Sequence, residues 1–250
     1  MIGCVKFTRS IDVVIRSYYR DFRWLALALR SLERFVSGYR RVVVVVPQAS
    51  LARSDVAVLG SGANVVVQSC GDFADDYVGQ QVTKLHADLY TDADIIFHLD
   101  SDQIFVAACD LRERLFEGSR LKMSFDRSRR RPANDGWRRC PESFFGRAIP
   151  WDLATPLPLA VPRHIYAALR ACCSENHGKT ITDYALTTAA DRFCEMTLLR
   201  GYAMLEEADE YRWVDAEHGG LIPECRTFWS RSTTPSAIAG SLPTCLSAYV

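Results

Sequence analysis

Residues 95–105 read IIFHLDSDQIF, an apolar, β-branched run that ends in two carboxylates, Asp100 and Asp102. Such a run fits a strand that is buried on both faces of a parallel sheet. Residues i and i+2 of an extended chain project to the same side, so both aspartates can converge on one cation while Ser101 points away. Hard divalent cations prefer carboxylate oxygens, and they need few protein ligands when phosphates supply the others. The stretch therefore predicts either a metal site or a solvated turn after a strand.

Apolar strands and helical segments alternate before this stretch. The runs with strand character are IDVVI at 11–15, RRVVVVVP at 40–47 and NVVVQ at 64–68. Helices are expected over 22–38, with Asp21 as N-cap and Gly38 as stop, over 51–59 and over 77–91. This alternation predicts an α/β domain with a mostly parallel central sheet flanked by helices. Ligands of such folds bind outside the carboxyl ends of the strands, where the two aspartates would lie.

The alternation weakens after residue 102. We expect a strand at 121–126, a loop at 127–142, and helices from Pro162 to near Gly178 and over 195–207. No linker separates the two halves, so the sequence indicates a single domain over residues 1–250. Its parts are a first half at 10–102, a second half at 103–230 and a Pro- and Ser-rich tail at 231–250.

Composition indicates a globular protein without a strong overall charge. Hydrophobic residues make up 48% of the 250 residues, and 30 basic residues balance 30 acidic ones, so nucleic acid or an anionic membrane would need a local patch. The nine cysteines are odd in number and lack zinc-ligand spacing, which favours a reduced compartment. We see no apolar run of signal-peptide or membrane-span length. We therefore expect a soluble, cytoplasmic protein with no transmembrane segment.

The strand that ends in LDSD follows a helix with the pattern QQxxKLxAD, and together they resemble the GT-A glycosyltransferases that use nucleotide-sugar donors. Residues 77–105 look like the DXD region of a bacterial branch of that superfamily. Residues 162–186, 193–204 and 211–215 look more loosely like its acceptor half. The resemblance covers residues 10–230 and implies a Rossmann-like GT-A domain with a nucleotide-sugar-binding half and a C-terminal acceptor-side half.

The resemblance assigns donor-side roles to several residues. Asp100 and Asp102 would hold the Mn²⁺ or Mg²⁺ that bridges the two phosphates of a nucleoside-diphosphate sugar. The residues expected to bind the donor are Arg16, Ser17, Tyr18, Asp72, Lys84 and Ser101. Lys84 has two other readings, an exposed helix lysine or an ion pair with Asp88 one helical turn later.

On the acceptor side, Glu195 matches the acid that superfamily members carry at a helix start, and Asp183 is a second candidate base. The alternative for Glu195 is a first-turn glutamate favoured by the helix dipole. His218 is the candidate third metal ligand, whereas His98 reads as a packed strand residue. Trp229 fits the closing aromatic segment of the superfamily, or simply the core.

An arginine-rich loop lies just beyond the acidic pair. Arg129, Arg130 and Trp137 are its candidate acceptor contacts, and its charge suggests an anionic acceptor such as a phosphorylated glycan, a lipid-linked glycan or a modified nucleic acid. A solvated loop explains the arginines equally well. The leading hypothesis is a metal-dependent glycosyltransferase. The alternatives are a nucleic-acid-binding protein on a degenerate transferase fold and a nucleotidyltransferase, which lacks support because no Gly-rich phosphate loop is present. Donor sugar, acceptor, stereochemistry and oligomeric state stay open.

Overall fold

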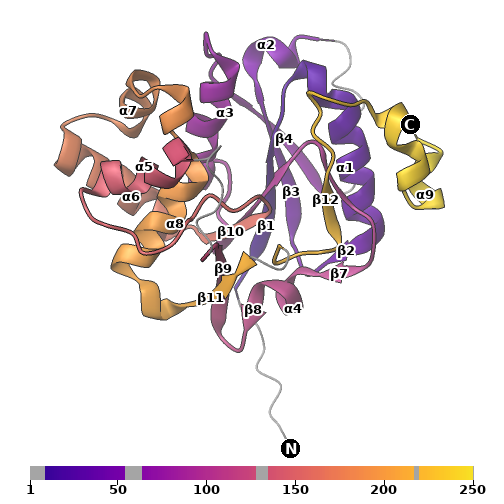
Figure 1. Cartoon of the computed structure of the whole chain (residues 1–250). Coiled ribbons are helices and arrows are strands. Elements are labelled where there is room, and N and C mark those ends of the chain that lie inside the picture. Colours follow the sequence, from indigo (N-terminus) through magenta and orange to yellow (C-terminus); the bar gives the residue numbers. More distant parts are fainter. Residues whose placement is uncertain (1–8, 54–63, 128–134, 217–219, 250) are drawn as a thin grey trace, which may run out of the picture.

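A five-stranded sheet forms the centre of the computed structural model, which describes residues 9–53, 64–127, 135–216 and 220–249 (Figure 1). The strand order is β10-β5-β1-β3-β4, and only β10 runs antiparallel to its neighbour. The strands are β1 (Ile11–Arg16), β3 (Arg41–Pro47), β4 (Val65–Cys70), β5 (Ile95–Asp100) and β10 (Leu159–Pro162).

The chain order of these strands reverses between β1 and β5. From β1 the chain moves outward through β3 to β4, and it then returns to β5 on the other side of β1. Such a reversal opens a ligand site at the carboxyl ends of the two central strands. Arg16 and Asp100, the last residues of β1 and β5, are paired neighbours at that edge.

Helices cover both faces of the sheet, which explains why its strands are apolar on both sides. Figure 1 shows α1 (Phe22–Phe35) on one face and α3 (Asp76–Lys84), α6 (His164–His177) and α8 (Glu195–Glu206) on the other. Residues 231–249, which the sequence suggested as a tail, contain two helical segments that pack on α1. These are η8 (Pro235–Ser241) and α9 (Thr244–Ser247), and their buried Ile238 and Leu246 contact the cluster around Trp24.

The remaining elements form smaller sheets and the connections around the central sheet. The strands are β2 (Val36–Ser37) with β7 (Cys109–Asp110), β6 (Gln103–Phe105) with β12 (Cys225–Thr227), and β8 (Phe116–Glu117), β9 (Arg120–Phe125) and β11 (Tyr211–Asp215). The helices are α2 (Gln48–Leu51), α4 (Leu111–Leu115), α5 (Asp135–Phe145), α7 (Ile181–Thr187) and the 3-10 turns η1 (Tyr19–Asp21), η3 (Ala87–Leu89), η5 (Ala190–Arg192) and η6 (Ala208–Glu210).

The predicted α/β sheet is confirmed, and the errors lie in its connections. The loop expected at 127–142 is wrong from Asp135 onward, because α5 forms there and buries Cys140 and Phe144. A proline, Pro141, is tolerated inside α5 where it packs against Gly201 of α8. The strand β10 was not expected. The helix predicted at 77–91 ends at Lys84 and is followed by the separate turn η3.

Two other helix limits differ from expectation. The helix expected at 51–59 is wrong at its start, because the short helix α2 ends at Leu51 and residues 52 and 53 are not helical. The rest of that prediction falls on residues 54–63, which lie outside the described part of the chain. The first helix ends at Phe35, three residues before the predicted stop at Gly38, because β2 begins there and pairs with β7. The predicted end of α6 is confirmed, since Gly178 adopts φ 62° at its C-cap, but its predicted start is wrong, because Pro162 is the last residue of β10 and α6 begins at His164.

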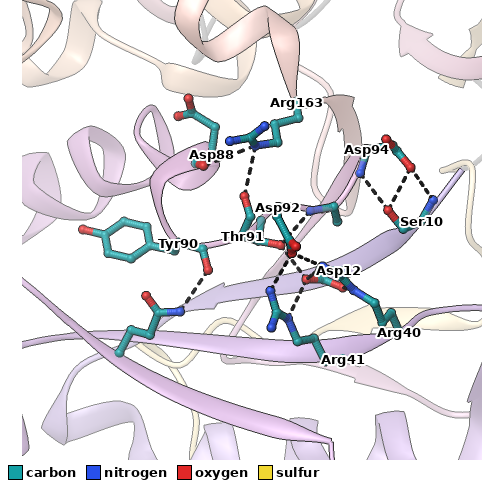
Figure 2. A network of polar contacts seen from close by, with 12 residues as sticks. Ser10, Asp12, Arg40, Arg41, Asp88, Tyr90, Thr91, Asp92, Asp94 and Arg163 are labelled. Atoms are coloured by element: carbon teal, nitrogen blue, oxygen red, sulfur yellow. Dashed lines mark hydrogen bonds and ion pairs between the residues drawn. The ribbon is translucent and has the colours of Figure 1, made fainter.

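A polar network holds the segment that enters β5, at the sheet edge opposite Asp100 (Figure 2). The carboxylate of Asp12, fully buried on β1, accepts hydrogen bonds from Arg40 and Arg41 at 2.8–2.9 Å and from Thr91 at 2.5 Å. Burial alone would raise the pKa of Asp12, but these bonds outweigh it and hold that pKa below its ordinary value. Arg163 donates from Nε to Thr91 O at 3.1 Å. The network therefore fixes the start of β5, and these contacts do not reach Asp100 at the other end of the strand. In the described ranges, no helix combines the length and the apolar character needed to cross a bilayer.

Candidate functional site

The site lies at the carboxyl edge of β1 and β5, where the sheet reverses its order. Ser17 follows β1 and Ser101 follows β5, and their hydroxyls share a hydrogen bond of 2.8 Å. Both serines are buried, so this bond joins the ends of the two strands inside the domain. Asp100 and Asp102 flank Ser101, and the side chain of Asp100 is 37% exposed.

Acidic groups from different elements gather around the pair. Asp21, at the start of α1, has its pKa raised to about 6 by burial and then by the negative charges of Asp102 and Asp100. Burial also raises the pKa of Asp102, and Asp100 adds to that effect although the Ser230 N–H opposes it. Asp21 occupies the predicted N-cap position of α1, yet its side chain makes no capping hydrogen bond. Mutually repelling carboxylates at one edge favour the binding of a cation there.

The acidic pair fits a hard divalent cation only with help from a ligand. Within residues 9–53, 64–127, 135–216 and 220–249, no three His, Cys, Asp or Glu side chains converge closely enough to hold a metal by themselves. His218, the predicted third ligand, lies outside these ranges. Two carboxylates with donor phosphates as the remaining ligands are a usual arrangement for Mg²⁺. The chemistry of Asp100 and Asp102 therefore suits a metal that arrives with a diphosphate.

Lys84 connects the acidic pair with helix α8. Its side chain is 4% exposed, and its Nζ lies 2.7 Å from Asp100 Oδ1 and 3.3 Å from Glu195 Oε1. Burial alone would lower the pKa of Lys84, but the carboxylates of Asp100 and Glu195 outweigh it and raise that pKa above its ordinary value. The two alternative readings of Lys84 are therefore wrong. It is buried, and Asp88 pairs instead with Arg170, through two bonds of 2.7 Å.

Glu195 opens α8 with its carboxylate buried beneath the site. The Gln81 side chain is oriented with its amide nitrogen toward Glu195. In this orientation Gln81 Nε2 donates to Glu195 Oε2 at 2.9 Å and to Phe193 O at 3.1 Å. The pKa of Tyr77 is raised to about 12, first by burial and second by the negative charge of the nearby Glu195. Glu195 is thus held from two sides, by a cation and by an amide.

Residues 227–232, which we term the C-terminal strap, close one side of the site. Phe228 N donates to Asp102 O at 3.0 Å, and Ser230 N donates to Asp102 Oδ2 at 2.8 Å. Phe228 stacks on Trp24 of α1, with ring centroids 6.2 Å apart. Arg231 places its guanidinium 5.0 Å from the ring centroid of Tyr77 at the start of α3. The strap therefore runs from the acidic pair to α3.

Trp229 is the tip of this strap. Its backbone has φ 53°, the left-handed conformation that costs a bulky residue free energy, and 70% of the residue is exposed. Of the two readings of Trp229, burial in the core is wrong, and a closing aromatic segment stays a prediction. Strain and an exposed indole beside a carboxylate site are typical of a residue that is kept for contact with a ligand.

The other predicted donor residues surround the site in different ways. Tyr18 is half-buried next to Ser17. Arg16 is buried and forms an ion pair with Asp76 at the start of α3, with one bond of 2.8 Å. Asp72 is exposed, and its Oδ1 accepts the N–H of Ala49 at 3.0 Å. Arg16 therefore fixes the start of α3, whereas Tyr18 is partly open to solvent and Asp72 is exposed.

The predicted acceptor residues are more scattered. Asp183 is exposed in the first turn of α7, where its carboxylate accepts the Thr180 hydroxyl at 2.7 Å. Trp137 is half-buried in the first turn of α5, and Arg129 and Arg130 lie outside the described residues. His98 is confirmed as a packed residue: it is fully buried, its Nε2 lies 2.6 Å from Tyr166 Oη, and burial followed by Lys84 and Arg200 lowers its pKa to about 3.

Sequence reasoning missed four residues around the site. Asp21 and Ser230 lie next to Asp102, Gln81 contacts Glu195, and Arg231 lies over Tyr77. Asp21 looked like an ordinary N-cap. Ser230 and Arg231 reach the site only because β12 pairs with β6 in a register that opposes Thr227 to Gln103. No linear spacing could have indicated that pairing.

No protein-family model matches this sequence, and no curated protein does. Among solved structures, the galactosyltransferase LgtC in complex with donor and acceptor sugar analogues has a TM-score of 0.51 at 16% identity, over 82% of this chain and 73% of that chain. An active-site mutant of LgtC, with glutamate in place of a glutamine, gives the same TM-score and coverage at 14% identity. The glycosyltransferase GlyE of Streptococcus pneumoniae TIGR4 has a TM-score of 0.45 at 14% identity, over 83% of this chain and 46% of that chain, which is too low to support an argument. The chain therefore has the mixed α/β fold of GT-A glycosyltransferases, as its sequence predicted.

Proposed function

We propose that this chain is a metal-dependent glycosyltransferase that moves a sugar from a nucleoside-diphosphate sugar to an acceptor hydroxyl. The observation that carries the proposal is the position of Asp100 and Asp102 at the sheet's reversal point, among carboxylates that repel one another. A fold shared with glycosyltransferases supports the reaction class.

Asp100 and Asp102 would hold the Mn²⁺ or Mg²⁺, together with oxygens of the donor diphosphate. The bound ion supplies Lewis-acid stabilisation for the negative charge on the departing diphosphate. Besides the proposed metal ion, Arg231 places a positive charge next to Tyr77, and this charge suits the donor diphosphate. Ser17 and Ser101 form the floor of the site, and Tyr18 and Asp72 are available to the nucleoside.

Lys84 keeps Asp100 in place. Its buried ammonium touches Asp100 Oδ1 at 2.7 Å and so fixes the orientation of that carboxylate. The exposed part of Asp100 stays available on the other side. The donor role that the sequence suggested for Lys84 is thus exerted through Asp100.

Glu195 is our candidate for the general base, and Asp183 is the alternative. Glu195 is buried at the start of α8, and its Oε1 lies 3.3 Å from Lys84 Nζ, so it can act as the base or anchor Lys84. Glu195→Gln separates the two roles that this geometry allows. Loss of turnover together with its acid-side pH dependence would identify the base, whereas a rise in the donor KM alone would identify an anchor for Lys84.

For the acceptor we propose a sugar or other hydroxyl compound that contacts the exposed indole of Trp229. A flat aromatic surface next to carboxylates suits a carbohydrate, since the ring packs on the indole while acidic oxygens accept hydroxyl hydrogens. An anionic acceptor, bound through Arg129, Arg130 and Trp137, remains a further prediction, and so does a modified nucleic acid.

The test is donor binding and slow donor hydrolysis with Mn²⁺ and a panel of UDP-, GDP- and dTDP-sugars. We expect one nucleotide class to raise the thermal stability of the protein only when Mn²⁺ is present. Asp102→Asn should abolish that shift, and Asp209→Asn, which changes an exposed aspartate on η6, should preserve it. No shift and no hydrolysis with any donor would refute the proposal. Salt-dependent DNA binding that is indifferent to Asp102→Asn would favour the nucleic-acid-binding alternative.

A further inference from the structure

Gln103 is buried at a junction of three segments that meet at the site. It is the first residue of β6, directly after the acidic pair, and it is 2% exposed. Its Oε1 accepts the N–H of Asp100 at 2.9 Å, and its Nε2 donates to Leu157 O at 2.7 Å and to Thr227 Oγ1 at 3.1 Å. One amide group thus contacts the acidic turn, the loop before β10 and the C-terminal strap.

The orientation of this amide follows from the chemistry of its neighbours. A backbone N–H only donates and a carbonyl oxygen only accepts, so Oε1 must face Asp100 and Nε2 must face Leu157. An exchange of the two atoms would break both bonds. Glutamate at this position would lack the donors, and methionine would lack donors and acceptor. Only a side chain with both functions, at the length of glutamine, satisfies all three partners.

The loop that Gln103 contacts has a second buried attachment, on α8. Arg200 is fully buried, and its Nη1 donates to Leu153 O and to Thr155 O, both at 3.0 Å. Since α8 begins at Glu195, the loop is fixed to the helix that carries the candidate base and, through Gln103, to the turn that carries Asp100. The relative position of Asp100 and Glu195 is therefore set from two directions, directly by Lys84 and indirectly by this loop.

We propose that Gln103 is a positioning residue that holds Asp100, the strap and the loop before β10 in the arrangement that binds the metal and donor. Its metal-binding consequence rests on the proposed function, and its effect on the strap does not. The hydrogen bond at Asp100 N fixes the peptide unit that aims the first carboxylate. The bond at Thr227 fixes the strand that delivers Ser230 to Asp102. A residue that orients ligands in this way typically changes metal affinity by about 10- to 100-fold when it is replaced.

The experiment compares wild type with Gln103→Met in two measurements. Free Mn²⁺ is followed by electron paramagnetic resonance, with Mn²⁺ alone and with each nucleoside diphosphate, and hydrogen exchange is followed in peptides that cover residues 100–105 and 225–231. We expect Gln103→Met to weaken Mn²⁺ binding by about 10- to 100-fold. We also expect the backbone amides of both peptides to exchange hydrogen faster in this variant than in the wild type. Gln68→Met is the matched control, because Gln68 also donates to one backbone oxygen, Tyr90 O at 2.9 Å, but lies on β4.

The outcomes separate this inference from the proposed function. If Gln103→Met binds Mn²⁺ with the affinity of the wild type and its peptides exchange hydrogen at the wild-type rate, the positioning role is overturned. If wild type binds no Mn²⁺ under any condition, the proposed function fails, and faster exchange in Gln103→Met would still support the structural junction. If Gln103→Met does not fold, Thr227→Val decides, because it removes only the contact with the strap. Faster exchange at 225–231 in that variant supports the role, and unchanged exchange overturns it.

Discussion

The replacement Lys84→Met tests whether one buried ammonium stabilises the whole site. The change removes the positive charge and keeps most of the side-chain volume. It leaves Glu195, with a side chain 7% exposed, as a buried carboxylate without a counter-ion, whereas Asp100, at 37%, can turn to water. Removal of one partner from a buried ion pair costs about 3–5 kcal/mol. Because one of the two acids can be solvated, we expect the lower end, about 3 kcal/mol.

That loss is large for a domain whose total stability is of the order of 5–15 kcal/mol. Urea unfolding at neutral pH, followed by circular dichroism, measures it as a change in midpoint at constant slope. Lys179→Met is the control, since Lys179 is exposed on the surface and should change stability by no more than about 0.5 kcal/mol. Glu195→Gln added to Lys84→Met removes the uncompensated charge and should restore a large part of the loss.

Two outcomes would contradict this reasoning. One is a loss in Lys84→Met no greater than in Lys179→Met, which would mean that Lys84 contributes nothing net after its own desolvation. The other is a double variant that is destabilised by the sum of the two single changes, because groups in contact must show a coupling energy, about 0.5–3 kcal/mol in size.

Three further predictions concern the core around the site. The folded pKa of His98, about 3, lies below its unfolded value of 6.5, so the unfolded state takes up the proton first and stability falls as the pH drops below 6.5. By about pH 5 the loss of unfolding free energy from His98 should reach about 2 kcal/mol. Urea unfolding should show a smaller loss between neutral pH and pH 5 in the double variant His98→Leu/Tyr166→Phe. Asp12→Asn should cost about 1–3 kcal/mol at neutral pH, because the amide nitrogen cannot accept the bonds that the carboxylate takes from arginine. Leu246→Ala should cost about 2 kcal/mol in the same assay if α9 is an integral part of the fold, and an unchanged midpoint would show that it is not.

The sequence was informative where residues are buried on a regular element. The strands β1, β3 and β5 are continuous apolar runs because helices cover both of their faces, and that pattern is readable without a structure. The helix α5 was not readable, because Pro141 and a run of arginines give it the composition of a loop. It forms because Cys140 and Phe144 are buried on that side of the domain. Tertiary packing decided that segment against its local composition.

In the site, the positions that the sequence indicated are those adjacent to the end of a strand. Asp100 and Asp102 lie at the carboxyl end of β5, where the apolar run placed them, and their role as metal ligands stays a prediction. The burial of Lys84 could not be read, because a helix pattern does not say which neighbours will cover its last turn. The contact between Ser230 and Asp102 spans 128 residues, and it depends on the pairing of two short strands.

These long-range contacts have a physical consequence for the acidic pair. Carboxylates that repel one another at the edge of a sheet would separate if their backbone were free. Lys84 opposes that separation at Asp100, and the Ser230 N–H opposes it at Asp102. Gln103 holds the backbone N–H of Asp100. The repulsion that remains is thus retained by the fold, and the divalent cation that we propose for this site would neutralise it without a large rearrangement of the chain.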